Sequence, residues 1–438
     1  MIKNQSVRFE LIRWSIFLIL ILTYIFVYFH RMAPAVVSND LTAAFGTSGA
    51  TLGTLAAIYF FVYAAMQIPS GVLSDTLGTR TAIIAGNLLA GMGSILFGLA
   101  ETFAIACMGR FIVGVGVSVV FVSIMKNNSI WFSERIFGFM SGLTLLIGNL
   151  GSIMATAPLA ALLTVCSWRV TFIGIGVVSI GLAVLGFFFV RNRPEDFGLS
   201  SLQEMEGKQP TTKRKQHWAK DLAAVVKTID IWPGFWVQLG ITGGIYAFMG
   251  LWGVPYLQNT FDLSREQAAL YMTDMLLAFA LGSLFFGWFS DRLGRRKPVL
   301  LVGVLLYIAA LLVIIFIPWT PGPVGFILFG MLGFLGSVFV ITFACAKETI
   351  DPNLAGMSVS IVNTGAFIGT TIIQPLFGWV LDLGWDGTMA GEVRMYSAAN
   401  YHNALFVLLV FAVIGLLGAL RVRETYCTNR VPEISPRQ

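Results

Sequence analysis

Residues 71–80, GVLSDTLGTR, return later in the chain as residues 287–296, GWFSDRLGRR. The two copies share glycine, serine, aspartate, leucine, glycine and arginine at matching places, offset by 216 residues in a chain of 438. A second echo links SVVFVSIMK, ending at Lys126, with SVFVITFACAK, ending at Lys347. Self-similarity at about half the chain length indicates an internal duplication. The sequence therefore predicts two related halves.

Around these motifs the chain is apolar, with 57% hydrophobic and 11% charged residues and a mean hydropathy of +0.81. Soluble domains carry roughly 25% charged residues. Twelve apolar runs each approach the roughly 20 residues that cross a bilayer. They are residues 14–37, 51–74, 81–100, 103–125, 137–162, 168–190, 232–257, 267–290, 298–317, 324–345, 357–381 and 401–420. We predict an all-α integral membrane protein with two pseudo-symmetric six-helix bundles, residues 1–190 and 231–438, joined by a cytoplasmic linker at 191–230.

The net charge of +6 is distributed unevenly. If the N-terminus is cytoplasmic and the number of spans is even, the outer loops hold few cations beyond Arg169, Arg265 and Arg394. This bias follows the positive-inside rule and places both termini and a short C-terminal tail in the cytoplasm. The polar, basic run KQPTTKRKQHWAK then belongs to a flexible linker. The first run lacks a signal-peptide cleavage pattern, and no folded basic module predicts nucleic-acid binding.

Catalytic and metal-binding signatures are missing from the sequence. The four cysteines, Cys107, Cys166, Cys345 and Cys427, are scattered without metal or disulfide spacing. No G-x-S-x-G, H-E-x-x-H or phosphate-binding loop is found, and there are only three histidines. The sequence therefore predicts a protein that is not an enzyme and needs no cofactor or metal.

The duplicated motif suits a tight turn between two helices. We expect Gly71 and Gly287 to allow close helix approach, and Gly78 and Gly294 to allow chain reversal. The motif's aspartates would accept backbone N–H groups at a helix start or pair with arginine. The alternative is a basic loop that only sets topology, and for the two lysines, outward snorkelling. The residues predicted to form a cytoplasmic gate are Asp75, Arg80, Lys126, Asp291, Arg295, Arg296 and Lys347.

This motif pair, with twelve spans and a long central loop, resembles the major facilitator superfamily over nearly the whole chain. GRFIVGVG at residues 109–116 is similar to the family's R-x-x-x-G-x-G element. WFSERIFG at 131–138, GNLGSIMATAPLAAL at 148–162, RNRPEDFG at 191–198 and AKETIDPNLAG at 346–356 resemble the bacterial organic-anion and sugar-acid symporter groups. The resemblance implies two bundles that close alternately on either side of one central substrate site.

The stretch YFHRMAPAVV, residues 28–37, places Arg31 inside the first span. An arginine facing lipid at the bilayer centre costs about 2.5–3.5 kcal/mol on insertion scales. We expect Arg31 to bind an anionic substrate group, and members of the superfamily that carry organic anions have an arginine at the matching place. The alternative is a snorkelling arginine beside a kink at Pro34. The seventh span has no second arginine, which disfavours a phosphate clamp.

Three further groups are candidates for proton coupling. Asp274 is an isolated carboxylate in the eighth span, or else it is solvated near the outer helix end. Glu348 ends the tenth span, where an ion pair is the alternative. Arg110 matches the family element that is associated with helix packing and proton coupling. His30 is a further candidate for substrate binding and a possible proton carrier, because imidazole ordinarily titrates near neutrality. It points about 100° away from Arg31, and a structural role is the competing interpretation.

Polar and aromatic side chains complete the predicted cavity. Amide and phenol groups are costly in lipid and therefore face protein or water, either lining a substrate site or bonding between helices. The remaining candidates for substrate binding are Tyr59, Tyr63, Asn149, Tyr246, Trp252, Asn363 and Gln374.

We interpret the chain as a secondary transporter that takes up a small organic anion with protons, by alternating access, as a monomer in a bacterial inner membrane. A dipeptide carrier is an alternative, because Arg31 and Asp274 could bind both charges. A drug/proton efflux antiporter is another, although Ala155 and Thr156 stand where that group carries Gly-Pro. A non-transporting membrane sensor is a third. We expect such a sensor to carry an appended module or extra spans, whereas 18 residues follow Leu420 here.

Overall fold

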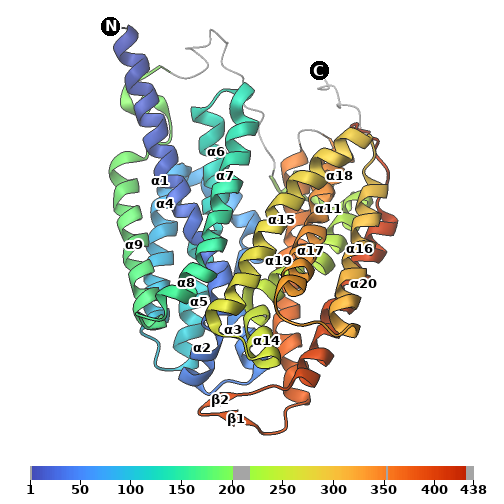
Figure 1. Ribbon diagram of the computed structural model, residues 1–438. Helices are drawn as coiled ribbons and strands as arrows, with labels where there is room; N and C mark the ends of the chain where they lie inside the picture. Colours follow the sequence, from blue (N-terminus) through green and yellow to red (C-terminus); the bar gives the residue numbers. More distant parts are fainter. Residues whose placement is uncertain (1, 201–217, 352–353, 431–438) are drawn as a thin grey trace. The chain divides into compact units, whose positions relative to one another are not determined.

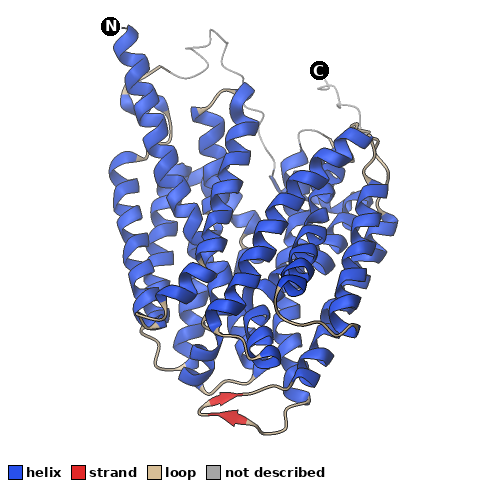
Figure 2. Ribbon diagram, viewed as in Figure 1, coloured by secondary structure: helices blue, strands red, loops and turns tan. Residues whose placement is uncertain are grey.

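The computed structural model describes residues 2–200, 218–351 and 354–430, and these are mostly helical (Figures 1 and 2). Within these ranges the sheet structure is one antiparallel hairpin, in which β1 (Met389–Ala390) pairs with β2 (Val393–Arg394). The all-α membrane fold predicted from the sequence is confirmed. Contacts divide the chain into two compact units, and each is described separately below.

Unit 1 contains residues 1–31, 65–155 and 162–215. Its helices are α1 (Ile2–Val36), whose last residues belong to unit 2, α4 (Gln67–Gly98), α5 (Phe103–Ser118), α6 (Val120–Trp131), α7 (Glu134–Met154), α9 (Trp168–Phe189) and η1 (Pro194–Phe197).

Unit 2 contains residues 32–64, 156–161 and 216–438. Its first helices are α2 (Ser38–Phe45), α3 (Gly49–Ala65), α8 (Ala157–Leu162), α11 (Trp218–Lys227) and η2 (Ile229–Ile231). One span follows in five pieces, α12 (Trp232–Val237), η3 (Gln238–Thr242), α13 (Gly243–Ala247), η4 (Phe248–Trp252) and α14 (Gly253–Phe261). The rest are α15 (Arg265–Leu293), α16 (Lys297–Phe316), α17 (Pro323–Gly336), η5 (Ser337–Phe339), α18 (Val340–Glu348), α19 (Ala355–Leu383) and α20 (Ala398–Arg421).

Eleven helical stretches of the described chain are long and apolar enough to span a bilayer. A twelfth would come from the pair α2 and α3, which is bent by 116°. The predicted run at residues 51–74 falls on α3 and the first residues of α4. The chain is therefore a multi-pass membrane protein with eleven to twelve candidate spans. The unit limits differ from the predicted halves, and the division at residues 191–230 stays a prediction about the duplicated sequence.

Glycines set the helix packing in unit 1. A methyl group at Gly93 of α4 would lie 2.8 Å from the carbonyl oxygen of Gly109 of α5. On another face of α4, a methyl group at Gly91 would lie 2.7 Å from the carbonyl oxygen of Gly176 of α9. Small residues let helix backbones approach in lipid, where burial of apolar surface adds little attraction between helices. Alternating glycine faces therefore let α4 pack between α5 and α9.

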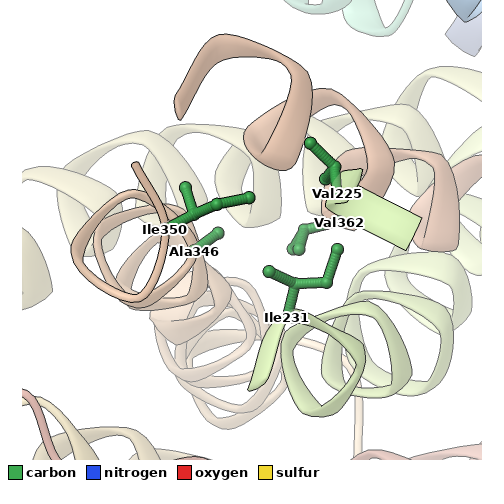
Figure 3. Close-up of a cluster of buried hydrophobic side chains, with 5 residues drawn as sticks. All are labelled: Val225, Ile231, Ala346, Ile350 and Val362. Atoms are coloured by element: carbon green, nitrogen blue, oxygen red, sulfur yellow. The ribbon is translucent and has the colours of Figure 1, made fainter. Parts of the chain in front are cut away.

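At the predicted cytoplasmic end of unit 2, an apolar cluster ties four elements together. Val225 of α11, Ile231 of η2 and Val362 of α19 meet Ala346 of α18 and Ile350, which follows that helix (Figure 3). Trp232 packs against this cluster and donates its indole N–H to the carbonyl oxygen of Val226, 2.9 Å away. Burial of these side chains anchors the end of the linker to the second half of the sequence.

The duplicated motif makes the expected turns but not the expected close approaches. Gly78 has φ +82° and Gly294 has φ +66°, values that favour glycine at a reversal. The prediction for Gly71 and Gly287 is wrong, because a methyl group at either would meet no atom within 4 Å among the described residues. The close approaches lie deeper in the spans, as at Gly93, where backbones rather than loop ends touch.

Candidate functional site

Arg31 is buried in α1 and only 3% exposed. Its guanidinium carbon lies 4.5 Å from the ring centroid of Tyr28, one turn earlier on the same helix. The hydroxyl of Tyr24, a further turn back, lies 3.5 Å from that of Tyr28. A cation over an aromatic face is held electrostatically, and arginine stacks there with its planar fork intact. The ladder of Tyr24, Tyr28 and Arg31 therefore orients a buried positive charge in unit 1.

The tyrosine ladder fits against α7 because residue 148 is glycine. A methyl group at Gly148 would lie 2.5 Å from the ring of Tyr24 and 3.2 Å from that of Tyr28. Phe121 of α6 stacks on Tyr24 with ring centroids 5.7 Å apart. Neither tyrosine was among the residues predicted to bind substrate. The signal was their spacing, because Tyr28 lies four residues after Tyr24 and three before Arg31, which places all three on one helix face.

Arg110 of α5 replaces a missing backbone hydrogen bond of α1, next to Arg31. Pro34 lies inside α1 and lacks the N–H group that would otherwise bond the carbonyl oxygen of His30. Arg110 donates Nη1 to that oxygen over 3.0 Å and is 1% exposed. The imidazole of His30 is 1% exposed, lies 6.1 Å from the Phe172 ring, and has no hydrogen-bond partner for either nitrogen among the described residues. The Arg110 contact therefore fixes the helix turn that carries Arg31.

The other candidates in unit 1 bond to backbone. Asn149 donates Nδ2 to the carbonyl oxygen of Leu145 in its own helix, 2.9 Å away. Lys126 donates Nζ to the carbonyl oxygen of Ser74 over 2.6 Å, which joins α6 to α4. Arg80 donates Nη2 to the carbonyl oxygen of Phe187, 2.7 Å away, and so joins α4 to α9. The side chain of Asp75 lies outside the described residues.

In unit 2, two groups of candidates contact α19. Tyr59 and Tyr63 of α3 have ring centroids 6.1 Å apart, and that of Tyr63 lies 4.6 Å from the ring of Phe367. Trp252 of η4 donates its indole N–H to the carbonyl oxygen of Gln374, 3.0 Å away. The amide of Gln374 is fully buried, and neither of its polar atoms has a hydrogen-bond partner among the described residues.

Three further residues of unit 2 lie on separate helices. Tyr246 of α13 is partly buried against the ring of Phe279, 6.1 Å away between centroids. Asn363 of α19 is half-buried. Asp274 of α15 packs beside Gly330 of α17, whose added methyl group would lie 3.1 Å from Oδ2 of the aspartate. That buried oxygen has no hydrogen-bond partner among the described residues.

Arg296 is the centre of a charged cluster at the start of α16. It donates to Asp291 through Nη1 and to Glu348 through Nη2, the latter over 2.7 Å. Burial alone would lower the pKa of Arg296, but the hydrogen bonds that it donates to Glu348 and Asp291 raise it overall. Glu348 is thus held in an ion pair. Arg295 and Lys347 are exposed, with Arg295 over the ring of Tyr426.

A carboxylate that the sequence analysis did not single out completes this cluster. Glu424 accepts the backbone N–H groups of Arg296 and Lys297 over 2.9 and 3.1 Å. Burial alone would raise the pKa of Glu424, but the backbone N–H groups hold it below its usual value. This contact joins residues 127 or more positions apart, so no local sequence pattern predicts it.

The family model described as Major Facilitator Superfamily matches residues 16–264 and 234–433. The chain belongs to this superfamily. The helical architecture described above agrees with membership of this superfamily. The chain is a transporter-family protein rather than an enzyme. The predicted resemblance is confirmed.

Two curated relatives cover most of the chain. One, named as the probable sulfoacetate transporter SauU of Cupriavidus necator, is 24% identical and covers 83% of this chain and 86% of its own. The other, named as the membrane sensor protein UhpC of Salmonella typhimurium, is 25% identical and covers 96% of this chain and 95% of its own. The sensor relative is thus matched over nearly its whole length. An appended module or extra spans therefore cannot serve to tell a sensor from a transporter here.

Solved structures show the same fold. A bacterial homologue of the human lysosomal transporter Spinster, in an inward-facing and occupied conformation, superposes with a TM-score of 0.73. It is 17% identical, and the match covers 93% of this chain and 96% of that one. This likeness concerns the fold alone.

Proposed function

We propose that this protein moves a small organic anion, a carboxylate or sugar acid, across the membrane by alternating access, in symport with protons. The proposal rests mainly on the position of Arg31, whose buried guanidinium lies over Tyr28 inside a span. A charge within a span is costly, and the charged residues that spans retain mark substrate and ion pathways. The relative named for sulfoacetate, a compound with two acid groups, supports an anionic substrate.

Each unit, taken by itself, has a buried polar side chain whose chemistry suits part of such a substrate. In unit 1, Arg31 supplies a fork of donors that matches a carboxylate or sulfonate. In unit 2, the buried amide of Gln374 has both a donor and an acceptor for a neutral polar group such as a hydroxyl. A buried amide without a partner carries a desolvation penalty that a substrate group would relieve.

Among the predicted proton-coupling residues, the contacts favour Asp274. Its Oδ2 is buried and unpartnered among the described residues, whereas Glu348 is bound to Arg296. Arg110 is committed to the carbonyl oxygen of His30. A carboxylate in lipid-like surroundings is stabilised in its neutral form, which suits a group that takes up and releases a proton during each cycle.

The test combines ligand-induced thermal shifts with uptake into proteoliposomes under an imposed pH gradient. Carboxylates, sulfonates, sugar acids, dipeptides and cationic drugs are compared on wild type, Arg31→Ala and Arg31→Lys. Loss of a charge-assisted bond of about 1.5–3 kcal/mol predicts that Arg31→Ala weakens anion binding by about tenfold or more. Arg31→Lys keeps the charge but loses the fork, so we expect intermediate affinity. Arg169→Lys, another partly buried arginine of unit 1, is the matched control.

Specific outcomes separate the alternatives. Stabilisation of wild type and Arg169→Lys by anions, but not of Arg31→Ala, supports the proposal. Shifts caused only by dipeptides or by cationic drugs indicate a peptide carrier or an efflux antiporter. The relative named as a membrane sensor makes a sensor the second candidate. Anion binding that depends on Arg31, without any uptake under a pH or substrate gradient, would favour the sensor.

A further inference from the structure

The start of α3 is held by a residue more than 330 positions away. Gly49 donates its backbone N–H to Oδ1 of Asp382 over 2.9 Å, and Ala50 donates to Oδ2 over 2.8 Å. The next two N–H groups, of Thr51 and Leu52, reach Oγ and the carbonyl oxygen of Ser48. The N–H groups of Gly49, Ala50 and Thr51, which have no partner within the helix, are therefore all satisfied. Two of them depend on the carboxylate of α19.

Asp382 is oriented for this contact by the loop that follows α19. The hydroxyl of Tyr396 donates to Oδ1 of Asp382 over 2.6 Å and accepts the N–H of Gly49 over 2.9 Å. Arg394 of β2 places Nη1 3.6 Å from the same oxygen. The carboxylate side chain is 18% exposed. These partners fix both oxygens toward α3, where the positive end of the helix dipole favours an anion.

Below the cap, α3 and α19 touch backbone to backbone. A methyl group at Gly49 would lie 2.7 Å from the carbonyl oxygen of Gly378, and one at Gly53 would collide with the backbone of Gln374 and Pro375. Further along, the ring of Phe60 lies 6.4 Å from that of Phe367. The contact near the cap thus lacks interlocking side chains, so the two helices can part without rotamer changes there.

Two more contacts at this end of unit 2 join early and late segments of the sequence. Arg265 of α15 pairs with Asp40 of α2 at 2.8 Å, and Asn39 donates to Gln258 over 3.3 Å. The capped helix α3 therefore lies within a wider set of polar contacts. By the predicted topology this end faces outward.

We propose that Asp382 is a gating residue of the transport cycle, whose two hydrogen bonds fasten α3 to α19 and close the outer side. This inference rests on the proposed alternating access, because α3 comes from the first predicted half and α19 from the second. Opening outward requires these bonds to break. The released N–H groups then bond to water, so the contact can break and form again during each cycle. Together, the hydrogen bonds to Asp382 stabilise the state in which the outer side is closed.

The test measures access to α3 directly and needs no substrate. Ala56 is 2% exposed and lies on the face of α3 that carries Gly53 and Phe60, one turn from each. Ala56→Cys is introduced after Cys107, Cys166, Cys345 and Cys427 are replaced by serine or alanine. The labelling rate with a membrane-impermeant maleimide is measured from each side, in right-side-out and inside-out vesicles.

We expect Asp382→Ala and Asp382→Asn to raise labelling from outside by about fivefold or more, since one lost bond is worth about 1 kcal/mol. Tyr396→Phe, which removes one orienting bond, should give a smaller rise. The matched control is Asp386→Asn, which removes the same charge four residues later, where the carboxylate is exposed and accepts the N–H of Thr388. It should leave labelling unchanged.

The outcomes decide between a latch and a local structural cap. Unchanged outside labelling in folded Asp382 variants, or an equal rise in Asp386→Asn, would overturn the proposal. If both Asp382 variants fail to fold, Tyr396→Phe decides alone, and no rise in that variant would also overturn it. Failure of the proposed substrate leaves this result intact, because labelling reports conformation without transport. Labelling that rises only from inside would contradict the assignment of the outer side.

Discussion

Helices α3 and α15 occupy equivalent places in the duplicated sequence, yet their first turns are bonded differently. The offset of 216 residues puts Ser48 on Ser264. In α15, Ser264 Oγ accepts the N–H of Gln267, and Gln267 Oε1 accepts the N–H of Ser264, a capping box closed within four residues. In α3, Ser48 Oγ accepts the N–H of Thr51, and Asp382 accepts those of Gly49 and Ala50.

The two duplicated helices thus share their sequence position but not the residues that bond their first N–H groups. The start of α15 is self-sufficient, so α15 keeps its first turn whatever its neighbours do. The start of α3 depends on a residue from the other half of the sequence, so its bonding must change if the halves separate. A gate needs one element that keeps its structure and another whose contacts can break. The comparison therefore makes α3 the releasable element.

The largest effect is expected from closing the backbone gap between α3 and α19. In Gly378→Ala the new methyl group would overlap the backbone of Gly49, and overpacking of this kind costs about 1–3 kcal/mol. We expect the closed outer side to lose that stability, with outside labelling of Ala56→Cys rising about fivefold to a hundredfold.

Two other glycines serve as controls for that substitution. Gly287→Ala meets nothing within 4 Å among the described residues and should change neither labelling nor thermal stability. Gly282→Ala of α15 would lie 2.5 Å from the carbonyl oxygen of Phe334 within the second half, so it should lower thermal stability without raising labelling. Equal labelling in all three variants would remove the distinction between α3 and α15.

A smaller effect is expected from the serine caps themselves. Ser264→Ala breaks a closed capping box and should lower the free energy of unfolding by about 1 kcal/mol. Ser48→Ala should cost less, because Asp382 still bonds two amides of α3. The measurement is denaturant unfolding of both variants, with Asp382→Ala added to each. Ser48→Ala should cost more in the Asp382→Ala background, whereas Ser264→Ala should cost the same in both.

The sequence predicts the fold and its turns because those depend on local chemistry. Apolar length gives the spans, and the repeated Asp-x-x-Gly pattern gives the positive φ of Gly78 and Gly294. Arg31 stands out because a charge interrupts an apolar run. The contact of Tyr28 with Arg31 could also have been predicted, because Tyr28 lies three residues before Arg31 on the same helix face. Its ring was not recognised because aromatic residues in spans are common.

Other features could not be obtained from the sequence. Asp382 sits near the end of an apolar run, where an acidic residue usually meets water, and its partners Gly49 and Ala50 offer only backbone N–H groups. Backbone donors carry no residue-type signature, so a contact over more than 330 positions leaves no pattern. The error at Gly71 and Gly287 has a related cause. A glycine in a motif does not say which helix faces it, and the close approaches follow from packing in three dimensions.

The smallest effect should come from the pair of Arg265 and Asp40, which ties the self-sufficient start of α15 to α2. The side chains are 24% and 27% exposed, and exposed ion pairs contribute about 0.2–1 kcal/mol. A double-mutant cycle with Arg265→Gln and Asp40→Asn should give a coupling energy in that range, falling as salt rises. Outside labelling of Ala56→Cys should rise less than twofold. A coupling energy equal to that of Asp382 with Tyr396, undiminished by salt, would mean that α15 is held across the halves as firmly as α3. The gate would then have two equal latches, and the asymmetry between the two helix starts would reflect only how their first amides are bonded.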